Sequence, residues 1–211
     1  MSEENDRSAR DFFPPKINLT SLRNAAKDCR GCDLWKIGTQ TVFGEGKTRS
    51  RVVLIGEQPG DSEDRSGYPF VGPAGRLLDT ALEEAGIDRE LAFVTNVVKH
   101  FKWKPRGKRR IHQKPNAREI EACFPWLQAE LEVVKPRVII CLGATAAQAL
   151  LGRTFHVTKQ RGRWIESNFT AKIMATVHPS SILRAPDDKT RETQFRAFVK
   201  DLKFAAEEIT K

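Results

Sequence analysis

The segment Lys99–Lys114, with the sequence KHFKWKPRGKRRIHQK, holds eight lysines and arginines, two histidines and no acidic residue. Such a density of positive charge is typical of a loop that contacts phosphate groups. His112, at the far tip of this loop, could also act as a base or a nucleophile, because a neutral imidazole carries a nitrogen lone pair. On composition alone, His112 is also open to a plainer interpretation, as one more phosphate-contacting residue.

Three other polar segments directly follow apolar runs. GEQPGD (Gly56–Asp61) follows RVVLI, Gly143 follows RVIICL, and HPSS (His178–Ser181) follows a further apolar stretch. Taken singly, GEQPGD is also typical of a tight turn with exposed acids. If the apolar runs are strands of one parallel sheet, ligands bind beyond their carboxyl ends. We therefore expect the three segments and the basic loop to converge on a single rim.

The elements that must position these groups follow from the hydrophobic pattern. Strands alternate with helices, which implies a parallel sheet covered by helices on both faces. The expected strands are residues 51–55, 93–98, 137–142 and 173–177, and the expected helices are residues 19–27, 75–85, 117–134, 144–151 and 190–209.

Length and composition predict one substantial α/β domain. The chain has 211 residues, of which 39% are hydrophobic, enough for one sizeable core. Residues 1–17 are charged and then rich in Phe and Pro, and we expect a flexible arm there. Residues 18–211 are expected to form a single domain, into which the basic loop 101–114 is inserted.

The charge balance favours a polyanionic partner. There are 36 basic and 27 acidic residues, a net charge of +9, and the isoelectric point is near 9.6. Nucleic acid is the expected partner, although net charge also serves solubility. The chain has no apolar run of about 18 residues and its N-terminus is too polar for a signal peptide. We therefore expect a cytoplasmic protein with no membrane partner and, for want of a dimer surface, a monomer.

Two of the four cysteines, Cys29 and Cys32, form a C-x-x-C motif. In a reducing compartment this motif indicates ligands of a metal or cluster, or a redox pair, rather than a structural disulfide. Surface thiols remain the alternative. Cys141 falls inside the strand expected at 137–142, where cysteine behaves as a small hydrophobic residue.

Five motifs point together to one family. As a set they resemble the iron-sulfur family 4 branch of the uracil-DNA glycosylases, over roughly residues 29–202. The resemblance implies a three-layer α/β/α sandwich around a central four-stranded parallel sheet. The motifs are GEQPGD (Gly56–Asp61), GYPFVGPAGRLLD (Gly67–Asp79), VTNVVKH (Val94–His100), LGATAAQALL (Leu142–Leu151) and VHPSSILR (Val177–Arg184).

The resemblance also implies a cofactor. In the family one cluster ligand is a cysteine in a VVKC-like segment, and His100 holds that place here. Histidine can replace cysteine as an iron ligand. We therefore expect a 4Fe-4S cluster held by Cys29, Cys32, His100 and Cys123, with zinc on the same ligands as the alternative.

The family assigns a uracil pocket to residues of these motifs. Phe70 would stack on the flipped base, a contact of about 1–3 kcal/mol. The Asn96 amide would donate to uracil O4 and accept from N3–H, a pattern that cytosine reverses. His178 would stabilise the leaving anion at O2. Asp61 would exclude the thymine methyl group, and Gly56 belongs to the same pocket. Without the family, Phe70 could be a core aromatic, Asn96 a turn cap and His178 a loop histidine.

KRRIH (Lys108–His112), together with Gln58, is similar to the UdgX subgroup, whose members become covalently attached to uracil-containing DNA. The usual motif has glycine in place of Gln58, which leaves room for the water that captures the sugar cation. The similarity implies instead that His112 attacks the deoxyribose C1′ and that the protein is consumed in one turnover. Glu57 would orient His112 or stabilise the sugar cation, and Gln58 would hold the loop or the base.

Two alternative functions stay open. One is ordinary hydrolytic excision with His112 as general base, and the other is a metal-stabilised DNA-binding module without catalysis. Single-stranded DNA is expected as the partner more than duplex, because a base leaves a single strand at the least cost. Leu183 or Ile182 would be an apolar wedge between bases. The expected DNA contacts are Lys108, Arg109, Arg110, Ser180 and Arg184.

Overall fold

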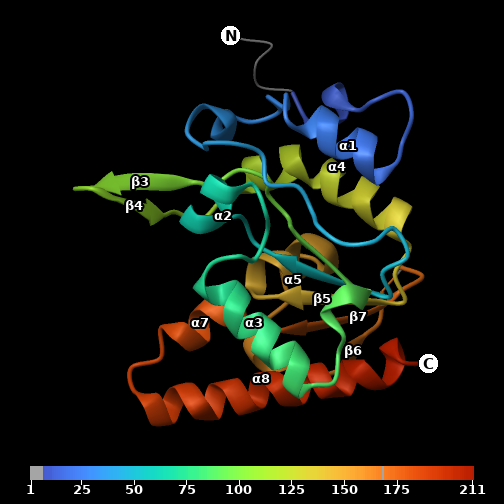
Figure 1. Cartoon of the computed structure of the whole chain (residues 1–211), viewed down its shortest axis with the longest axis vertical. Coiled ribbons are helices and arrows are strands. Elements are labelled where there is room, and N and C mark those ends of the chain that lie inside the picture. Colours follow the sequence, from blue (N-terminus) through green and yellow to red (C-terminus); the bar gives the residue numbers. More distant parts are fainter. Residues whose placement is uncertain (1–6, 168) are drawn as a thin grey trace.

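A central sheet organises the chain, for which the computed structural model describes residues 7–167 and 169–211 (Figure 1). The strand order is β2-β1-β5-β7-β6. The four longer strands run parallel, whereas β6 pairs antiparallel with β7. Because helices cover both faces, the longer strands are continuous apolar runs. The strands are β1 (Val52–Gly56), β2 (Ala92–Asn96), β5 (Val138–Leu142), β6 (Trp164–Ile165) and β7 (Lys172–Thr176).

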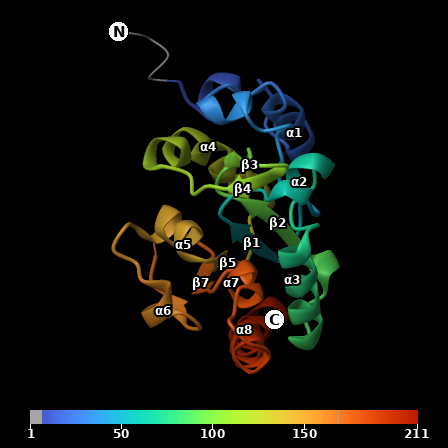
Figure 2. The same cartoon turned by 90° about the vertical axis from the view of Figure 1, so that its left-hand side faces the viewer.

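Alternate residues of the strands enter two separate cores, one on each face of the sheet. Val53 and Ile139 belong to the core shared with the first set of helices, and Leu54 and Ile140 belong to the core shared with the second. The three-layer α/β/α sandwich predicted from the sequence is therefore confirmed (Figure 2). The first set is α1 (Leu19–Ala26), α4 (Ala117–Val134) and α5 (Ala144–Leu151), and the second is α3 (Pro73–Glu84), α7 (Pro179–Leu183) and α8 (Asp188–Ile209).

Short elements complete the fold. They occupy the connections between the sheet and the long helices. They are the 3-10 helices η2 (Ala9–Phe12), η3 (Asp33–Lys36) and η4 (Arg89–Leu91), the α-helices α2 (Asp61–Ser66) and α6 (Val157–Gln160), and the strands β3 (Trp103–Arg106) and β4 (Arg109–His112).

The predicted sheet of four strands lacked β6. A strand of two residues, Trp164–Ile165, is too short for a period-2 pattern to be recognised. The second strand was also predicted too long, because it ends at Asn96 and not at Val98. Val97 and Val98 are fully buried loop residues, so their apolar character reflects burial rather than strand structure.

The predicted flexible arm is packed where the structure describes it. Ser8 caps η2, and Ala9 is fully buried. The rings of Phe13 and Trp126 lie 4.8 Å apart, so this segment closes over α4. Residues 8–13 of the expected flexible arm therefore pack against the fold, and its first six residues lie outside the described part of the chain.

The basic loop is a β-hairpin, which the sequence analysis did not predict. Strands β3 and β4 pair antiparallel, and Gly107 occupies the turn with a φ of 57°. A positive φ at a hairpin turn favours glycine. His112 pairs with Trp103 at the base of the hairpin, so its expected place at the tip is wrong. The hairpin projects from the body of the molecule (Figure 1).

Among the described residues, no helix combines the length and the apolar character that crossing a membrane requires.

Candidate active site

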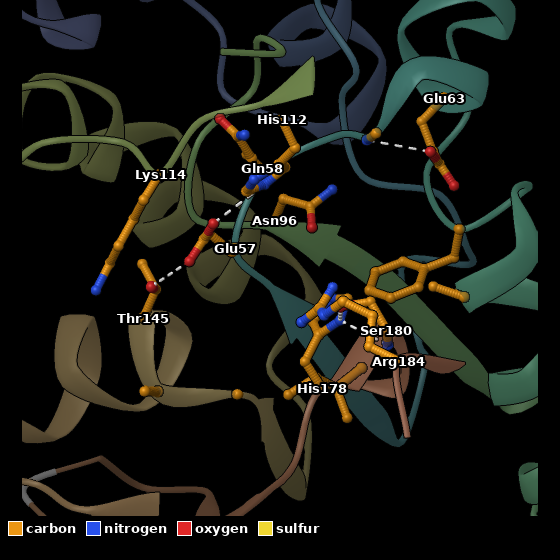
Figure 3. A pocket seen from close by; sticks show the side chains of 16 residues that line it. Glu57, Gln58, Glu63, Asn96, His112, Lys114, Thr145, His178, Ser180 and Arg184 are labelled. Atoms are coloured by element: carbon orange, nitrogen blue, oxygen red, sulfur yellow. Dashed lines mark hydrogen bonds and ion pairs between the residues drawn. The ribbon is translucent and has the colours of Figure 1, made fainter. Parts of the chain in front are cut away.

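A cavity of about 600 Å³ opens at the carboxyl ends of the parallel strands. Glu57 follows β1, Asn96 ends β2, Gly143 follows β5 and His178 follows β7, and all four line the cavity (Figure 3). His112 reaches the same cavity from the hairpin. The expected convergence of the strand ends and the basic segment on one rim is therefore confirmed.

Gly56 allows two pocket side chains to approach each other. A Cβ at this position would overlap Asn96 Oδ1 and would lie 2.8 Å from Cζ of Phe70. The Phe70 backbone has a φ of 56°, a conformation that is strained for a residue with a bulky side chain. Gly75 tolerates this loop, because a Cβ there would overlap the Phe70 carbonyl. Phe70 is thus a buried residue of the core on the second face of the sheet whose ring also lines the pocket.

Asn96 is the polar end of a buried strand. It is 3% exposed, and its backbone carbonyl accepts a hydrogen bond of 2.8 Å from Nζ of Lys99. Lys99 also donates to Glu130 at 2.7 Å and to Thr95 at 2.7 Å, with all three side chains buried. The strand end that carries the Asn96 amide is thus held by a buried ion pair, while the amide itself lines the cavity.

His178 has a defined tautomer. The backbone N–H of Ser180 donates to Nδ1 at 3.1 Å, so the proton of the neutral ring is on Nε2. Burial lowers the pKa of His178 to about 4, which keeps the ring neutral near pH 7. The Ser180 hydroxyl also lies 2.8 Å from Nδ1. Ser180, expected as a DNA contact, therefore holds His178 instead.

Glu57 joins His112 to α5. Its Oε1 lies 3.2 Å from Nε2 of His112, and its Oε2 accepts a hydrogen bond from Thr145 (Figure 3). Burial by itself raises the pKa of Glu57, but the hydrogen bonds from His112 and Thr145 outweigh it, so the pKa lies below its ordinary value. The carboxylate is therefore ionised near pH 7. The His112 side chain is 50% exposed and open to an incoming ligand.

Gln58 fastens the base of the hairpin. Its side-chain amide donates to the carbonyl of Gln113 at 2.9 Å and to that of Lys102 at 3.3 Å, and it accepts from the Lys102 N–H at 3.1 Å. These contacts reach the chain on both sides of the hairpin, just outside β3 and β4. Of the two roles expected for Gln58, holding the loop is the one that its hydrogen bonds serve.

Arg110 and Asp61 lie away from their expected positions. The Arg110 guanidinium pairs with Asp61 and, at 2.6 Å, with the buried Asp64, so it ties the hairpin to α2. Asp61 does not line the cavity, which contradicts its expected place beside the thymine methyl group. Glu63 lines the cavity instead, held by backbone N–H donors of Gly60 at 3.1 Å and Gly72 at 2.8 Å. Glu63, two residues after the GEQPGD motif, is therefore the acid that faces the pocket.

Of the two expected wedge residues, Ile182 is fully buried, whereas Leu183 is 37% exposed. Only Leu183 is accessible to a base stack. Arg184 lines the cavity, and Lys108 and Arg109 are exposed at the end of the hairpin, in positions where a nucleic acid could reach them.

Three polar side chains that line the cavity were missed by the sequence analysis. They are Glu63, Lys114 and Thr145. Thr145 follows Gly143 at the start of a helix, and a hydroxyl at the carboxyl end of a strand is a signal that could have been used. Lys114 was counted only as part of the basic segment, because its direction depends on the hairpin.

A second site contains the expected cluster ligands. Cys29, Cys32, His100 and Cys123 line one internal cavity, next to the first helix of the fold and α4. Cys141 lies in β5, fully buried and outside this cavity, as predicted. Two of the cavity's sulfurs already accept hydrogen bonds, from Trp126 Nε1 at 3.3 Å and from the Lys99 N–H at 3.2 Å.

The protonation of these donors suits a bound cation. Burial raises the pKa of the Cys32 thiol to about 11 and raises that of Cys123 as well, so both are neutral unless a metal binds. Burial lowers the pKa of His100 to about 4, which leaves an imidazole lone pair. Among the described residues no three His, Cys, Asp or Glu side chains converge closely enough for one metal ion. Three thiols and one imidazole are donor types that both an iron-sulfur cluster and a zinc ion accept.

Comparison with known proteins agrees with this architecture. Residues 43–203 match the model of the uracil DNA glycosylase superfamily, and the chain belongs to that superfamily. More particularly, it is 40% identical to a type-4 uracil-DNA glycosylase of Thermotoga maritima over 166 residues, which cover 78% of this chain and 83% of the relative. A type-4 enzyme of Pyrobaculum aerophilum is 37% identical, with 81% and 87% covered. A type-5 enzyme of the same organism is less similar, at 28% identity, with 78% and 76% covered.

Proposed function

We propose that the protein excises uracil from DNA, preferentially single-stranded DNA, and then binds the abasic sugar covalently through His112. Membership of the superfamily supports uracil excision as the activity. The proposal of covalent capture by His112 rests on the pairing of His112 with Glu57 at 3.2 Å. Both residues line the cavity that Asn96 and His178 also line.

Base recognition follows from the buried amide and the aromatic ring. Asn96 donates to uracil O4 and accepts from N3–H, and the fixed strand end makes the reversed pattern of cytosine costly. Phe70 stacks on the flipped base at about 1–3 kcal/mol. The carboxylate of Glu63, locked by two backbone donors, supplies the bulk that excludes the thymine methyl group.

Cleavage of the bond between uracil N1 and C1′ leaves negative charge on the base and positive charge on the sugar. The Nε2–H of neutral His178 donates to O2 and stabilises the anion without a proton transfer. The ionised Glu57 carboxylate stabilises the sugar cation as it forms.

Capture of the cation falls to His112. An unprotonated ring nitrogen of His112 donates its electron pair to C1′, and a carbon–nitrogen bond forms. The imidazolium that results is stabilised by the ionised Glu57 and then loses its remaining N–H proton to solvent, leaving a neutral alkylated imidazole. Gln58 supports this step by holding the base of the hairpin over the cavity. Because such an imidazole is a poor leaving group, the adduct persists and each molecule acts once.

The exposed cations of the hairpin and Arg184 contact DNA phosphates in this proposal. Lys108 and Arg109 lie at the end of the hairpin, and the exposed Leu183 enters the base stack. Arg110 serves by holding the hairpin to α2 rather than by contacting a phosphate.

A 4Fe-4S cluster is proposed as the resident cofactor. Cys29, Cys32, His100 and Cys123 would hold it, and it would supply structural cross-linking between the first helices, β2 and α4. No step of the proposed reaction requires electron transfer.

One experiment separates the three functions considered. The protein is incubated with a single-stranded oligonucleotide carrying one uracil, and the mixture is run on a denaturing gel before and after alkali. A heat-resistant and detergent-resistant slow band supports covalent excision. Alkali-labile DNA without that band identifies ordinary hydrolysis, and unchanged DNA leaves only a binding module. Either of the last two outcomes contradicts the proposal.

A further inference from the structure

A second surface cavity, of about 330 Å³, lies beside the hairpin. It is a separate cavity from the uracil pocket, and of the residues with a role assigned above only Cys32, one of the proposed cluster ligands, lines it. Its volume falls within the range of small-molecule sites. Its lining includes the aromatic ring of Trp35 and the cationic side chains of Arg7, Arg30, Lys36 and Arg118.

The chain itself places this cavity next to the uracil pocket. Lys114 lines the uracil pocket, and Asn116, two residues later, lines the second cavity. Two residues span at most about 7 Å of chain, a distance that one or two nucleotides of a single strand can cover. The hairpin also rests on the segment that carries Trp35, because Trp103 Nε1 donates to the carbonyl of Ile37 at 2.8 Å. The two cavities are therefore neighbours along one basic surface.

Trp35 presents its ring to solvent. It is 37% exposed, although a tryptophan is usually highly buried. The Arg30 guanidinium lies over the ring, 4.8 Å from its centroid, and the Lys36 ammonium also lies over the ring, 6.0 Å from the centroid, so a base that stacks on a covered face displaces the cation there. An exposed aromatic ring with cations beside it is the arrangement by which single-stranded nucleic acids are bound without sequence preference.

The two acids of the cavity do not cancel its positive charge. Asp33 pairs with Lys36 at 2.8 Å, and Glu119 pairs at 2.8 Å with Lys102, which lies outside the cavity lining. The lining thus contains four cations against two acids, one of which is already paired from outside. The cavity is suited to an anionic ligand with an aromatic part.

We propose that this cavity binds a nucleotide of the same DNA strand, close to the flipped uridine, with its base stacked on Trp35 and its phosphate at Arg30. The inference rests on the proposed function in that it takes the uracil pocket as the neighbouring site. The second cavity extends the contact with single-stranded DNA beyond the catalytic pocket and needs no particular base.

The test is equilibrium binding of a fluorescein-labelled dT15 oligonucleotide, which carries no uracil and so cannot be attacked. Trp35→Leu is expected to weaken binding about tenfold, the loss of one base–aromatic stack. Arg30→Gln is expected to lower the slope of log K against log salt by about 1, the loss of one phosphate contact. Thermal unfolding of both variants checks that they are folded. If only one variant is folded, the binding change of that variant alone tests the inference.

Trp164→Leu is the matched control. Trp164 is also a partly exposed tryptophan with a lysine nearby, Lys172 at 5.6 Å, but it lies on β6 at the far edge of the sheet. Its loss should leave dT15 binding unchanged. If Trp35→Leu and Arg30→Gln bind dT15 as the wild type does, with the same salt slope, the inference is overturned. Because dT15 binding needs no excision, this result is independent of whether the protein attacks uracil.

Discussion

Two sites of opposite character lie at either end of the segment 96–100. The uracil pocket is open, and its polar groups are held by neighbours while facing an incoming ligand, as His112 is with half of its side chain exposed. The cysteine cavity is much smaller, and its donors, buried except for the half-buried Cys32, are neutral without a cation. Asn96 lines the first, and Lys99 and His100 line the second. The difference teaches that one strand end can serve a reaction on one side and stability on the other.

The largest effect is expected in the open pocket. His112→Ser should abolish the covalent adduct, with a loss of at least about 10³-fold in its rate of formation, because serine without an adjacent base is a weak nucleophile. Uracil excision should persist, since a water can enter the vacated space. Adduct is measured on denaturing gels, and abasic sites by alkali cleavage. Lys203→Ser, an exposed change on α8 at a residue with no assigned role, is the control, and adduct at the wild-type rate in His112→Ser would contradict the assignment.

In the cysteine cavity, Cys123→Ser should remove the cluster while Cys141→Ser should not. Both thiols are buried, but only Cys123 lines the cavity. Visible absorption of the purified proteins, with iron and sulfide analysis, measures cluster content. We expect near-complete loss in the first variant and wild-type content in the second. Equal iron content in all three proteins would show that Cys123 is not a ligand.

Breaking the buried ion pair between Lys99 and Glu130 should lower the free energy of unfolding. Lys99→Met leaves the fully buried Glu130 without its cation, and such a change costs about 3–5 kcal/mol of unfolding free energy. Denaturant titration measures it. The double variant Lys99→Met with Glu130→Gln should recover part of the loss, because the unpaired charge is gone. A single variant as stable as the wild type would mean that the pair does not support the strand end.

A smaller effect concerns pH. The pKa of His178 is about 4 in the folded chain, below the unfolded value of about 6.5, so the unfolded state takes up a proton first as pH falls. The neutral His178 contributes fully to the unfolding free energy above about pH 6.5, and this contribution is lost as the pH falls toward 4. The loss is about 2 kcal/mol at pH 5. His178→Gln should therefore flatten the fall in unfolding free energy between pH 7 and 5. An unchanged slope would contradict a buried neutral His178. Burial lowers the pKa of His100 in the same way, but in the proposed cluster-bound protein His100 is a ligand and does not take up a proton over this pH range.

The sequence predicted the layers and the convergence of the strand ends because buried parallel strands and amphipathic helices leave strong patterns. The helix expected to open at residues 115–117 and to run to about residue 134 corresponds to α4, in which Asn116 is the cap. Proximity in the sequence also predicted that Glu57 and Gln58 lie at the carboxyl end of β1, and both line the pocket.

The remaining features depend on contacts between distant residues. The hairpin could not be predicted, because its short strands are rich in lysine and arginine and its anchors, Asp64 and Gln58, come from other elements. The place of Glu63 could not be predicted for the same reason: backbone donors of Gly60 and Gly72 hold Glu63 at the pocket, whereas Asp61 pairs with Arg110. No local pattern encodes such directions.

The central claim is that His112 forms the bond to the sugar, and tandem mass spectrometry of the proteolysed adduct tests it most directly. After reaction with a uracil-containing single strand and nuclease digestion, the fragment spectra should place a deoxyribose-derived mass on His112. The peptide that contains His178 should be unmodified. A modification on any other residue, or a uracil-free DNA product with no modified peptide, would contradict the account.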